Sequence, residues 1–128
     1  MPERRREMQD AEMQDMIPVF RRRKRVAAVY LFGSAATGRQ RRGSDLDLAI
    51  IAKSKITGHE RLKMETDLSS RFRRDVDLVV FGQAGPLLQH QILKYGRLIY
   101  EKDPAERVRQ EVRARAEYLD TRSLFREL

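Results

Sequence analysis

Cysteine and tryptophan are missing from the 128 residues, and glycine and proline occur only seven and four times. Without cysteine, the chain can form neither disulfides nor thiolate metal sites. No low-complexity stretch suggests a linker, and the length suits one hydrophobic core. We therefore expect a single domain over residues 1–128, made of an N-terminal helical segment (1–25), a core (26–100) and a C-terminal helix (101–128).

Long hydrophobic runs are missing too. The longest strongly apolar stretch covers residues 26–32, whereas a membrane-spanning helix needs about 20 apolar residues. The first residues, MPERRR, lack the apolar stretch of a secretion signal. We therefore expect a cytoplasmic protein.

Acidic residues are outnumbered by basic ones, 19 to 27, which gives a formal net charge of +8. Such an excess predicts an anionic partner or substrate, which could be a nucleotide, a nucleic acid or an acidic protein. Two clusters, Arg21–Arg25 and Arg39–Arg42, are nearly pure positive charge. The first could bind RNA, but a solvated helix end is the commoner explanation, so direct nucleic-acid binding is not favoured.

Three short apolar runs predict β-strands. Residues 26–32 (VAAVYLF), 46–52 (LDLAIIA) and 76–81 (VDLVVF) show little polar alternation, which is typical of strands buried on both faces. Residues 97–100 suit a short final strand. With helices between and around these strands, the chain is expected to have an α/β (α+β) fold, a small mixed β-sheet with helices packed on it.

The first two predicted helices have clear boundary signals. Residues 3–17 are good helix formers, and Pro18 is expected to break the helix before a short basic one. Thr57 and Glu60 form a potential capping box, which opens a second helix that reaches about Phe72.

Two more helices follow. Pro86 and Gly96 suit the two ends of one of them, and Asp103 and Glu106 frame the start of the other. The last helix is expected to pack an apolar stripe against another surface. The stripe consists of Ala105, Val108, Val112, Ala116 and Leu119.

The most informative stretch joins the first two predicted strands. Gly33 and Ser34 leave the first strand, and Asp45 and Asp47 open the second. Glycine allows close backbone approach, while the Ser34 hydroxyl and the N–H groups of a helix start can bind phosphate oxygens. Arg39 lies in the intervening loop, where contact with a triphosphate or an acidic partner and simple exposure are about equally expected.

Carboxylates at these positions predict a metal site. Residues two apart on a strand face the same way, so the side chains of Asp45 and Asp47 should lie side by side. Such a pair recruits a cation, and oxygen ligands favour Mg²⁺ or Mn²⁺. Asp77 lies in an apolar run, where a buried carboxylate needs a partner such as this metal. In a two-metal arrangement, Asp77 could be a further ligand or the base, whereas Asp75 is expected to pair with a nearby arginine.

These residues resemble a known signature. Residues 33–50 (GSAATGRQRRGSDLDLAI) are similar to the Gly-Ser and Asp-x-Asp motif of the DNA polymerase beta-like nucleotidyltransferases, and Val76–Val79 resembles the strand that carries their third carboxylate. Because the chain is short and the similarity covers about residues 26–128, it most resembles the minimal nucleotidyltransferase (MNT) group.

The resemblance implies a nucleotidyltransferase-type core. It agrees with catalysis and metal binding by Asp45, Asp47 and Asp77, and with nucleotide binding by Gly33 and Ser34. Arg39 stays a candidate for nucleotide binding because of its place in the loop. It further implies an Mg²⁺-dependent antitoxin of a type VII toxin–antitoxin system, which transfers AMP from ATP to a tyrosine of a HEPN ribonuclease toxin. The alternatives are nucleotide transfer to a small molecule or an RNA end, and a non-catalytic antitoxin that neutralises its toxin by binding alone.

Overall fold

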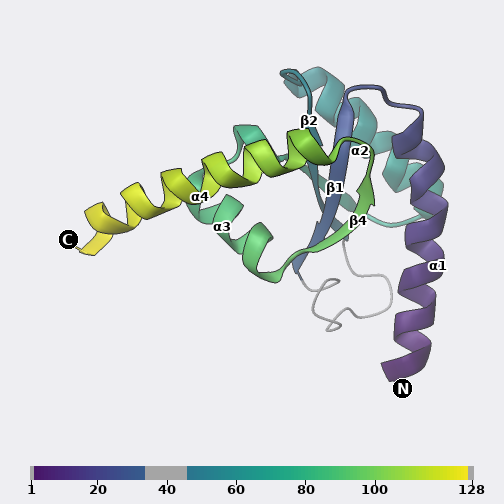
Figure 1. Ribbon diagram of the computed structural model, residues 1–128. Coiled ribbons are helices and arrows are strands. Elements are labelled where there is room, and N and C mark those ends of the chain that lie inside the picture. Colours follow the sequence, from purple (N-terminus) through teal and green to yellow (C-terminus); the bar gives the residue numbers. More distant parts are fainter. Residues whose placement is uncertain (1, 34–45, 127–128) are drawn as a thin grey trace.

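The computed structural model describes residues 2–33 and 46–126, which form a four-stranded sheet covered by helices on both faces (Figure 1). The elements follow in the order α1 (Pro2–Arg21), β1 (Val26–Phe32), β2 (Leu46–Ala52), α2 (Gly58–Phe72), β3 (Val76–Val80), the short 3₁₀ helix η2 (Phe81–Gln83), α3 (Pro86–Tyr95), β4 (Arg97–Glu101) and α4 (Pro104–Arg126).

The sheet is mixed, as the sequence predicted. Its strands lie in the order β3-β2-β1-β4; β1 is antiparallel to both neighbours, and β3 is parallel to β2. The parallel pair requires a crossover connection, which α2 supplies. The central strands β1 and β2 are buried almost throughout, as expected. For β3 the expectation of burial on both faces is wrong, because this strand lies at the sheet edge and alternates between buried and more exposed residues.

Two hydrophobic cores hold the helices against the sheet. On one face, Met16 and Phe20 of α1 and Leu68 of α2 pack on the strands. On the other face, Ile92 of α3 and Ala114 of α4 pack against β1 and β2. The sheet is therefore enclosed between α1 with α2 and α3 with α4 (Figure 1).

The predicted break at Pro18 is wrong. Helix α1 continues through Pro18 to Arg21, and the described residues between Arg21 and the start of β1 at Val26 form no second helix. Proline removes one backbone hydrogen bond, but Met16 and Phe20, on either side of it, are almost completely buried. The burial of these two side chains outweighs the lost bond.

The predicted helix ends are confirmed. Thr57 Oγ1 accepts a hydrogen bond from the Glu60 N–H at 3.1 Å, and the Glu60 carboxylate accepts one from the Thr57 N–H at 3.3 Å. At the start of α4, Asp103 Oδ1 accepts from the Glu106 N–H at 3.2 Å. The Gly96 N–H closes α3 by donating to the carbonyl four residues earlier at 2.7 Å.

The apolar stripe of α4 does not pack against the sheet. Val108, Val112 and Leu119 are exposed, whereas Glu111 and Ala114 face the sheet and are buried. Within the two described ranges, no helix combines the length and the hydrophobicity that crossing a membrane requires.

Candidate active site

The structure brings Asp47 and Asp77 together. They are direct partners in the parallel pairing of β2 with β3, and paired residues on neighbouring strands project from the same face, with the strands about 4.8 Å apart. Asp47 is half-buried and Asp77 is exposed. Two carboxylates thus lie next to each other at the end of the sheet where β2 and β3 begin.

Gly33 lies directly against Asp47, one member of this acidic pair. Its φ of +71° falls in the left-handed region, and a Cβ atom at this position would come within 2.3 Å of Asp47 Oδ2. Antiparallel pairing of β1 with β2 explains the contact, because Phe32, the residue before Gly33, is the register partner of Asp47. Only glycine fits here, since any side chain would occupy the space of the carboxylate.

The other predicted site residues, Ser34, Arg39 and Asp45, lie outside the described residues. Among the residues that the structure does describe, no group of three or more His, Cys, Asp or Glu side chains could hold a metal ion. Asp47 and Asp77 supply two carboxylates, and oxygen donors of this kind suit a hard divalent cation. A third ligand would have to come from elsewhere, and the sequence predicted Asp45 for this role.

Asp77 differs from the sequence-based expectation in one respect. A buried carboxylate was expected, but the Asp77 side chain is exposed. The physical reason is that β3 is an edge strand, with Val76 and Leu78 turned into the core and Asp77 turned outward. Burial therefore does not force Asp77 to have a partner, and its importance depends on its position beside Asp47 and on its access to solvent.

Helix α2 fixes the outer edge of β3 around Asp77, which the sequence did not reveal. The Leu78 N–H donates to the carboxylate of Glu65 at 2.8 Å, and Arg61 donates to the Leu78 carbonyl at 3.2 Å. Upstream, the Val76 N–H donates to Ser69 Oγ at 3.0 Å. Since edge strands leave backbone groups without strand partners, these three side chains replace the missing strand on both sides of Asp77.

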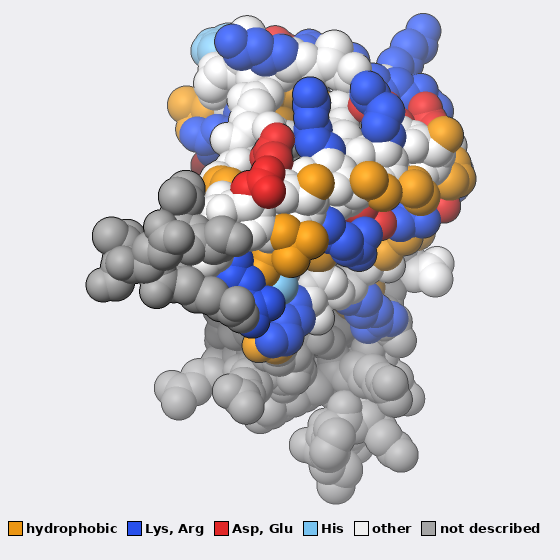
Figure 2. Space-filling model, turned by 60° about the vertical axis from the view of Figure 1, so that its left-hand side comes forward, with side chains coloured by type: hydrophobic (Ala, Val, Ile, Leu, Met, Phe, Trp, Pro, Cys, Tyr) orange, Lys and Arg blue, Asp and Glu red, His pale blue; other side chains and the backbone are white. Residues whose placement is uncertain are grey.

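Basic side chains are prominent on the molecule. Figure 2 shows, on the side from which α4 projects, several groups of Lys and Arg with fewer acidic side chains among them. This distribution agrees with the net charge of +8 and favours anionic partners.

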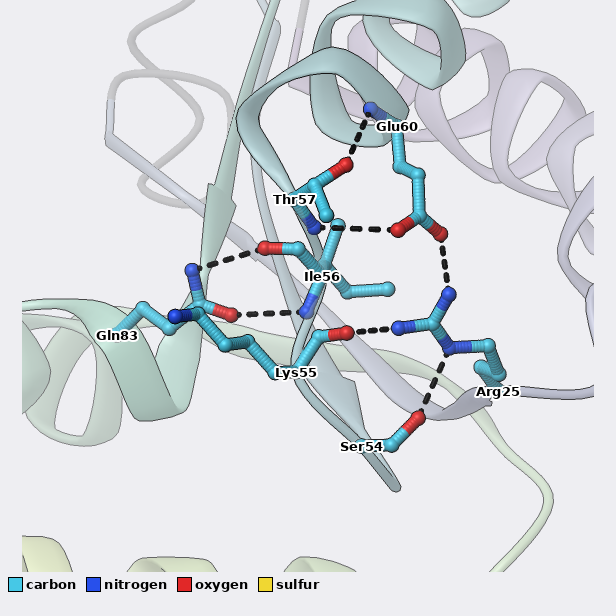
Figure 3. Close-up of polar contacts among 7 residues, drawn as sticks. All are labelled: Arg25, Ser54, Lys55, Ile56, Thr57, Glu60 and Gln83. Carbon is cyan, nitrogen blue, oxygen red and sulfur yellow. Dashed lines mark hydrogen bonds and ion pairs between the residues drawn. The ribbon is translucent and has the colours of Figure 1, made fainter.

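Part of the basic run Arg21–Arg25 has a structural role. Arg25 donates to Ser54 Oγ at 2.9 Å, to the Lys55 carbonyl and to the carboxylate of Glu60, the capping residue of α2 (Figure 3). Arg23 forms an ion pair with Asp67, in which Nη2 lies 3.4 Å from Oδ2. Because Arg25 joins the end of β2 to the start of α2, this residue is explained by the fold and not by nucleic-acid binding.

A second polar cluster connects α4 to the sheet. The Tyr30 hydroxyl donates to Glu111 Oε1, and Arg107 contacts the carboxylates of both Glu111 and Glu101. Burial, followed by the bond to Glu111, holds the pKa of Tyr30 well above its usual value. The cluster is thus a partly buried hydrogen-bonded anchor, in which each charge has a partner.

A surface hollow of about 490 Å³ lies elsewhere, at the far end of β2, and its lining includes Ala52, Phe81 and Gln110. Ala52 lies five positions after Asp47 on β2, which is roughly 16 Å at about 3.3 Å per residue. Asp47 and Asp77 do not line the hollow. The hollow and the acidic pair are therefore separate features of the structure.

Comparison with known proteins identifies the family to which the chain is similar. Residues 14–105 match the model of the family described as "Polymerase beta, Nucleotidyltransferase". The protein adenylyltransferase MntA of Shewanella oneidensis is 35% identical over 72 residues, which cover 56% of this chain and 52% of that protein. The chain thus matches about half the length of this curated relative.

Solved structures share the fold. A tri-AMPylated Shewanella oneidensis HEPN toxin in complex with an MNT antitoxin gives a TM-score of 0.78 at 22% identity, covering 93% of this chain and 93% of that chain. A toxin–antitoxin structure with AMP-PNP gives a TM-score of 0.77 at 23% identity, covering 92% of this chain and 93% of that chain. At these identities, the structures show the fold alone. The family match, by contrast, spans well over half of the sequence and includes the strands that carry the acidic pair, so the chain belongs to the polymerase beta nucleotidyltransferase family.

Proposed function

We propose that this chain transfers AMP from ATP to a hydroxyl group of a partner protein, a tyrosine of a HEPN ribonuclease toxin, and thereby acts as an antitoxin. The observation that carries the proposal is the register of Asp47 with Asp77 beside Gly33. Family membership supports nucleotide transfer, and the adenylyltransferase name of the 35% identical relative supports AMP and a protein acceptor.

The acidic set fits Mg²⁺. Asp47 and Asp77, with Asp45 as the proposed third ligand, would hold one or two ions through oxygen atoms, and the chain has no cysteine that would favour a softer metal. When bound, Mg²⁺ supplies positive charge that offsets the charge on the phosphate oxygens during transfer.

The residues of the chain bind and orient the reactants. The backbone at Gly33 and the Ser34 hydroxyl are proposed to bind triphosphate oxygens, together with the Arg39 guanidinium. Asp77 is exposed, so an acceptor hydroxyl can reach it and transfer its proton to the carboxylate. The acceptor oxygen then forms a bond to the α-phosphorus, the bond to the bridging oxygen breaks, and pyrophosphate leaves.

The same proposal covers organisation and location. Helices α1 and α4, from the two ends of the chain, pack on opposite faces of one sheet, which supports residues 1–128 as one functional unit. A reaction that consumes ATP and protects cellular RNA belongs in the cytoplasm.

Substitution of the acidic pair tests the function. The chain is incubated with Mg²⁺, ATP labelled at the α-phosphate and the purified HEPN protein encoded by the adjacent reading frame. Asp47→Asn and Asp77→Asn should each lower labelling of the partner by at least about 100-fold, because each removes a negative oxygen from the reacting centre. Asp67→Asn, a change of the same kind on the outside of α2, should leave labelling unchanged.

Two outcomes would contradict this proposal. Full labelling by both Asp47→Asn and Asp77→Asn would remove the acidic pair from the reaction. Toxin neutralisation that survives in these variants without any labelling would identify an antitoxin that works by binding alone.

Addition of EDTA should abolish labelling of the partner, and excess Mg²⁺ should restore it.

A further inference from the structure

Helix α4 turns mainly polar side chains toward the sheet and apolar side chains toward solvent, the opposite of the usual arrangement in a surface helix. Residues Arg107, Gln110, Glu111 and Ala114 face the sheet. On the opposite side, Val108, Val112 and Leu119 are 46%, 59% and 61% exposed. We define the outer face of α4 as Ala105, Val108, Val112, Ala116 and Leu119.

Specific polar contacts fix this orientation. Glu111 accepts a hydrogen bond from Tyr30 of β1, and Arg107 donates to Glu101 at the end of β4. The Gln110 amide donates to the Ala52 carbonyl at 2.9 Å. Rotation of α4 to bury its valines would break all three contacts and leave buried polar groups without partners, which is unfavourable. The outward direction of the apolar stripe is therefore a property of the fold.

The outer face has the dimensions of a helix-docking site. Its residues are spaced by three or four positions, so they form a continuous stripe, and the 14 steps from Ala105 to Leu119 span about 21 Å at 1.5 Å per residue. Exposed apolar stripes of this kind commonly bind partner proteins. Figure 2 shows a broken band of hydrophobic side chains on the side from which α4 projects, with Lys and Arg above and below it.

The charges beside the stripe identify the kind of partner. Along its two sides lie four exposed arginines, Arg109, Arg113, Arg115 and Arg122, and only two exposed acids, Glu117 and Asp120. Three of these arginines also contact carboxylates of α4, those of Glu106, Glu117 and Glu111, but their side chains are still 59–79% exposed. In a dimer of this chain through the outer face, these arginine rows would meet each other, and like charges at an interface disfavour association. An acidic partner would instead place carboxylates opposite the arginines.

We propose that the outer face of α4 is the docking surface for the protein that this enzyme modifies, and that the partner presents an apolar strip flanked by acidic side chains. The inference rests on the proposed function for the existence of a protein acceptor. The acidic pair lies at another part of the molecule, at the start of β2 and β3, so docking and chemistry use different residues. Substitutions on α4 should therefore change binding without changing the reaction.

Calorimetric titration of the full chain with the purified HEPN protein, without ATP, tests the surface. Val112→Glu should weaken binding by at least about tenfold, because it places a charge in an apolar contact and repels an acidic partner. Val108→Gln, which removes only apolar contact, should weaken it less. Leu62→Glu is the matched control, since Leu62 is 53% exposed on α2. This variant should bind the HEPN protein with the affinity of the original chain.

Kinetics separate docking from catalysis. In the AMP-transfer assay, Val112→Glu should raise the KM for the partner about tenfold and leave kcat unchanged. Unchanged binding by both Val112→Glu and Val108→Gln, with helical content and melting temperature like those of the original chain, would overturn the proposal. A dimer of the isolated chain in sedimentation that Val112→Glu dissociates would also overturn it, in favour of a second copy as occupant. If the original chain binds but never transfers AMP, the proposed function fails and the docking surface stands.

Discussion

At position 33, both the backbone conformation and the lack of space for a side chain require glycine. We expect Gly33→Ala to lower AMP transfer by at least about tenfold, because the new methyl group would displace the Asp47 carboxylate, which lies 2.3 Å from the Cβ position. Because φ is positive at this position, the alanine should also reduce the free energy of unfolding by about 1–2 kcal/mol.

Thermal unfolding and transfer rates, measured on the same preparations, check both effects. Gly58→Ala provides the control, because a Cβ atom on Gly58 has no neighbour within 4 Å and the residue lies at the start of α2. It should leave transfer unchanged. Full activity in Gly33→Ala would mean that the position of the Asp47 carboxylate beside Gly33 does not matter for the reaction.

The acidic pair shows what could be foreseen at the residue scale. The spacing of Asp45 and Asp47 and the Gly-Ser turn before them selected Asp47 and Gly33 as candidates. The position of Asp77 in an apolar run selected the third. The exposure of Asp77 could not be foreseen, because it depends on the position of β3 at the edge of the sheet. The sequence of β3 is apolar enough for a central strand, and strand order is a property of the tertiary fold.

At the scale of elements, α2 acts as a substitute for a strand beside β3. We expect Glu65→Ala to reduce the free energy of unfolding by about 1–3 kcal/mol, because the Leu78 N–H would lose its acceptor and Arg61 would lose its ion pair. AMP transfer should fall as well, since Leu78 is next to Asp77. Glu65 is therefore a positioning residue.

Glu65→Gln separates positioning from charge. The glutamine amide oxygen can still accept from the Leu78 N–H, so this variant should recover most of the lost transfer activity, whereas the ion pair to Arg61 stays lost. Chemical denaturation and the transfer assay measure the two effects. Equal losses of activity in Glu65→Ala and Glu65→Gln would show that this hydrogen bond does not position Asp77.

Helices show both the strength and the limit of sequence-based prediction. The caps at Thr57 and Asp103 depend on residues three positions apart, so local sequence was sufficient to find them. The effect of Pro18 was mispredicted, and the outward direction of the apolar stripe of α4 was not foreseen, because tertiary contacts decide both. Burial of Phe20 carries α1 through the proline, and the bond from Tyr30 to Glu111, 81 residues apart, turns the valines of α4 outward.

For the whole molecule, acid should destabilise the fold through its helix caps. Backbone hydrogen bonds, first from Thr57 to Glu60 and from Glu106 to Asp103, lower the pKa of these two carboxyl groups from 4.5 and 3.8. Since their pKa values are lower in the folded state, their stabilising effect is fully present above those unfolded values. It is lost as the pH falls through the folded values, when the unfolded chain has already taken up protons.

Melting temperatures between about pH 6 and about pH 3 measure this effect. The double variant Glu60→Gln, Asp103→Asn should melt at a lower temperature than the original chain near neutral pH and should lose less stability on acidification. Repulsion within a chain of net charge +8 adds a decline that both proteins share. Identical pH profiles for the two proteins would show that the caps do not control acid stability.

The reversed amphipathicity of α4 has a practical consequence for protein engineering. Purified alone, the chain presents three large apolar side chains to water along one helix, which promotes aggregation at high concentration. Replacing these residues with polar ones should therefore improve yield and shelf life. If the outer face of α4 is the docking surface, a selection for the best-behaved free protein would enrich variants that no longer recognise their target, so solubility and biological effect should be screened together.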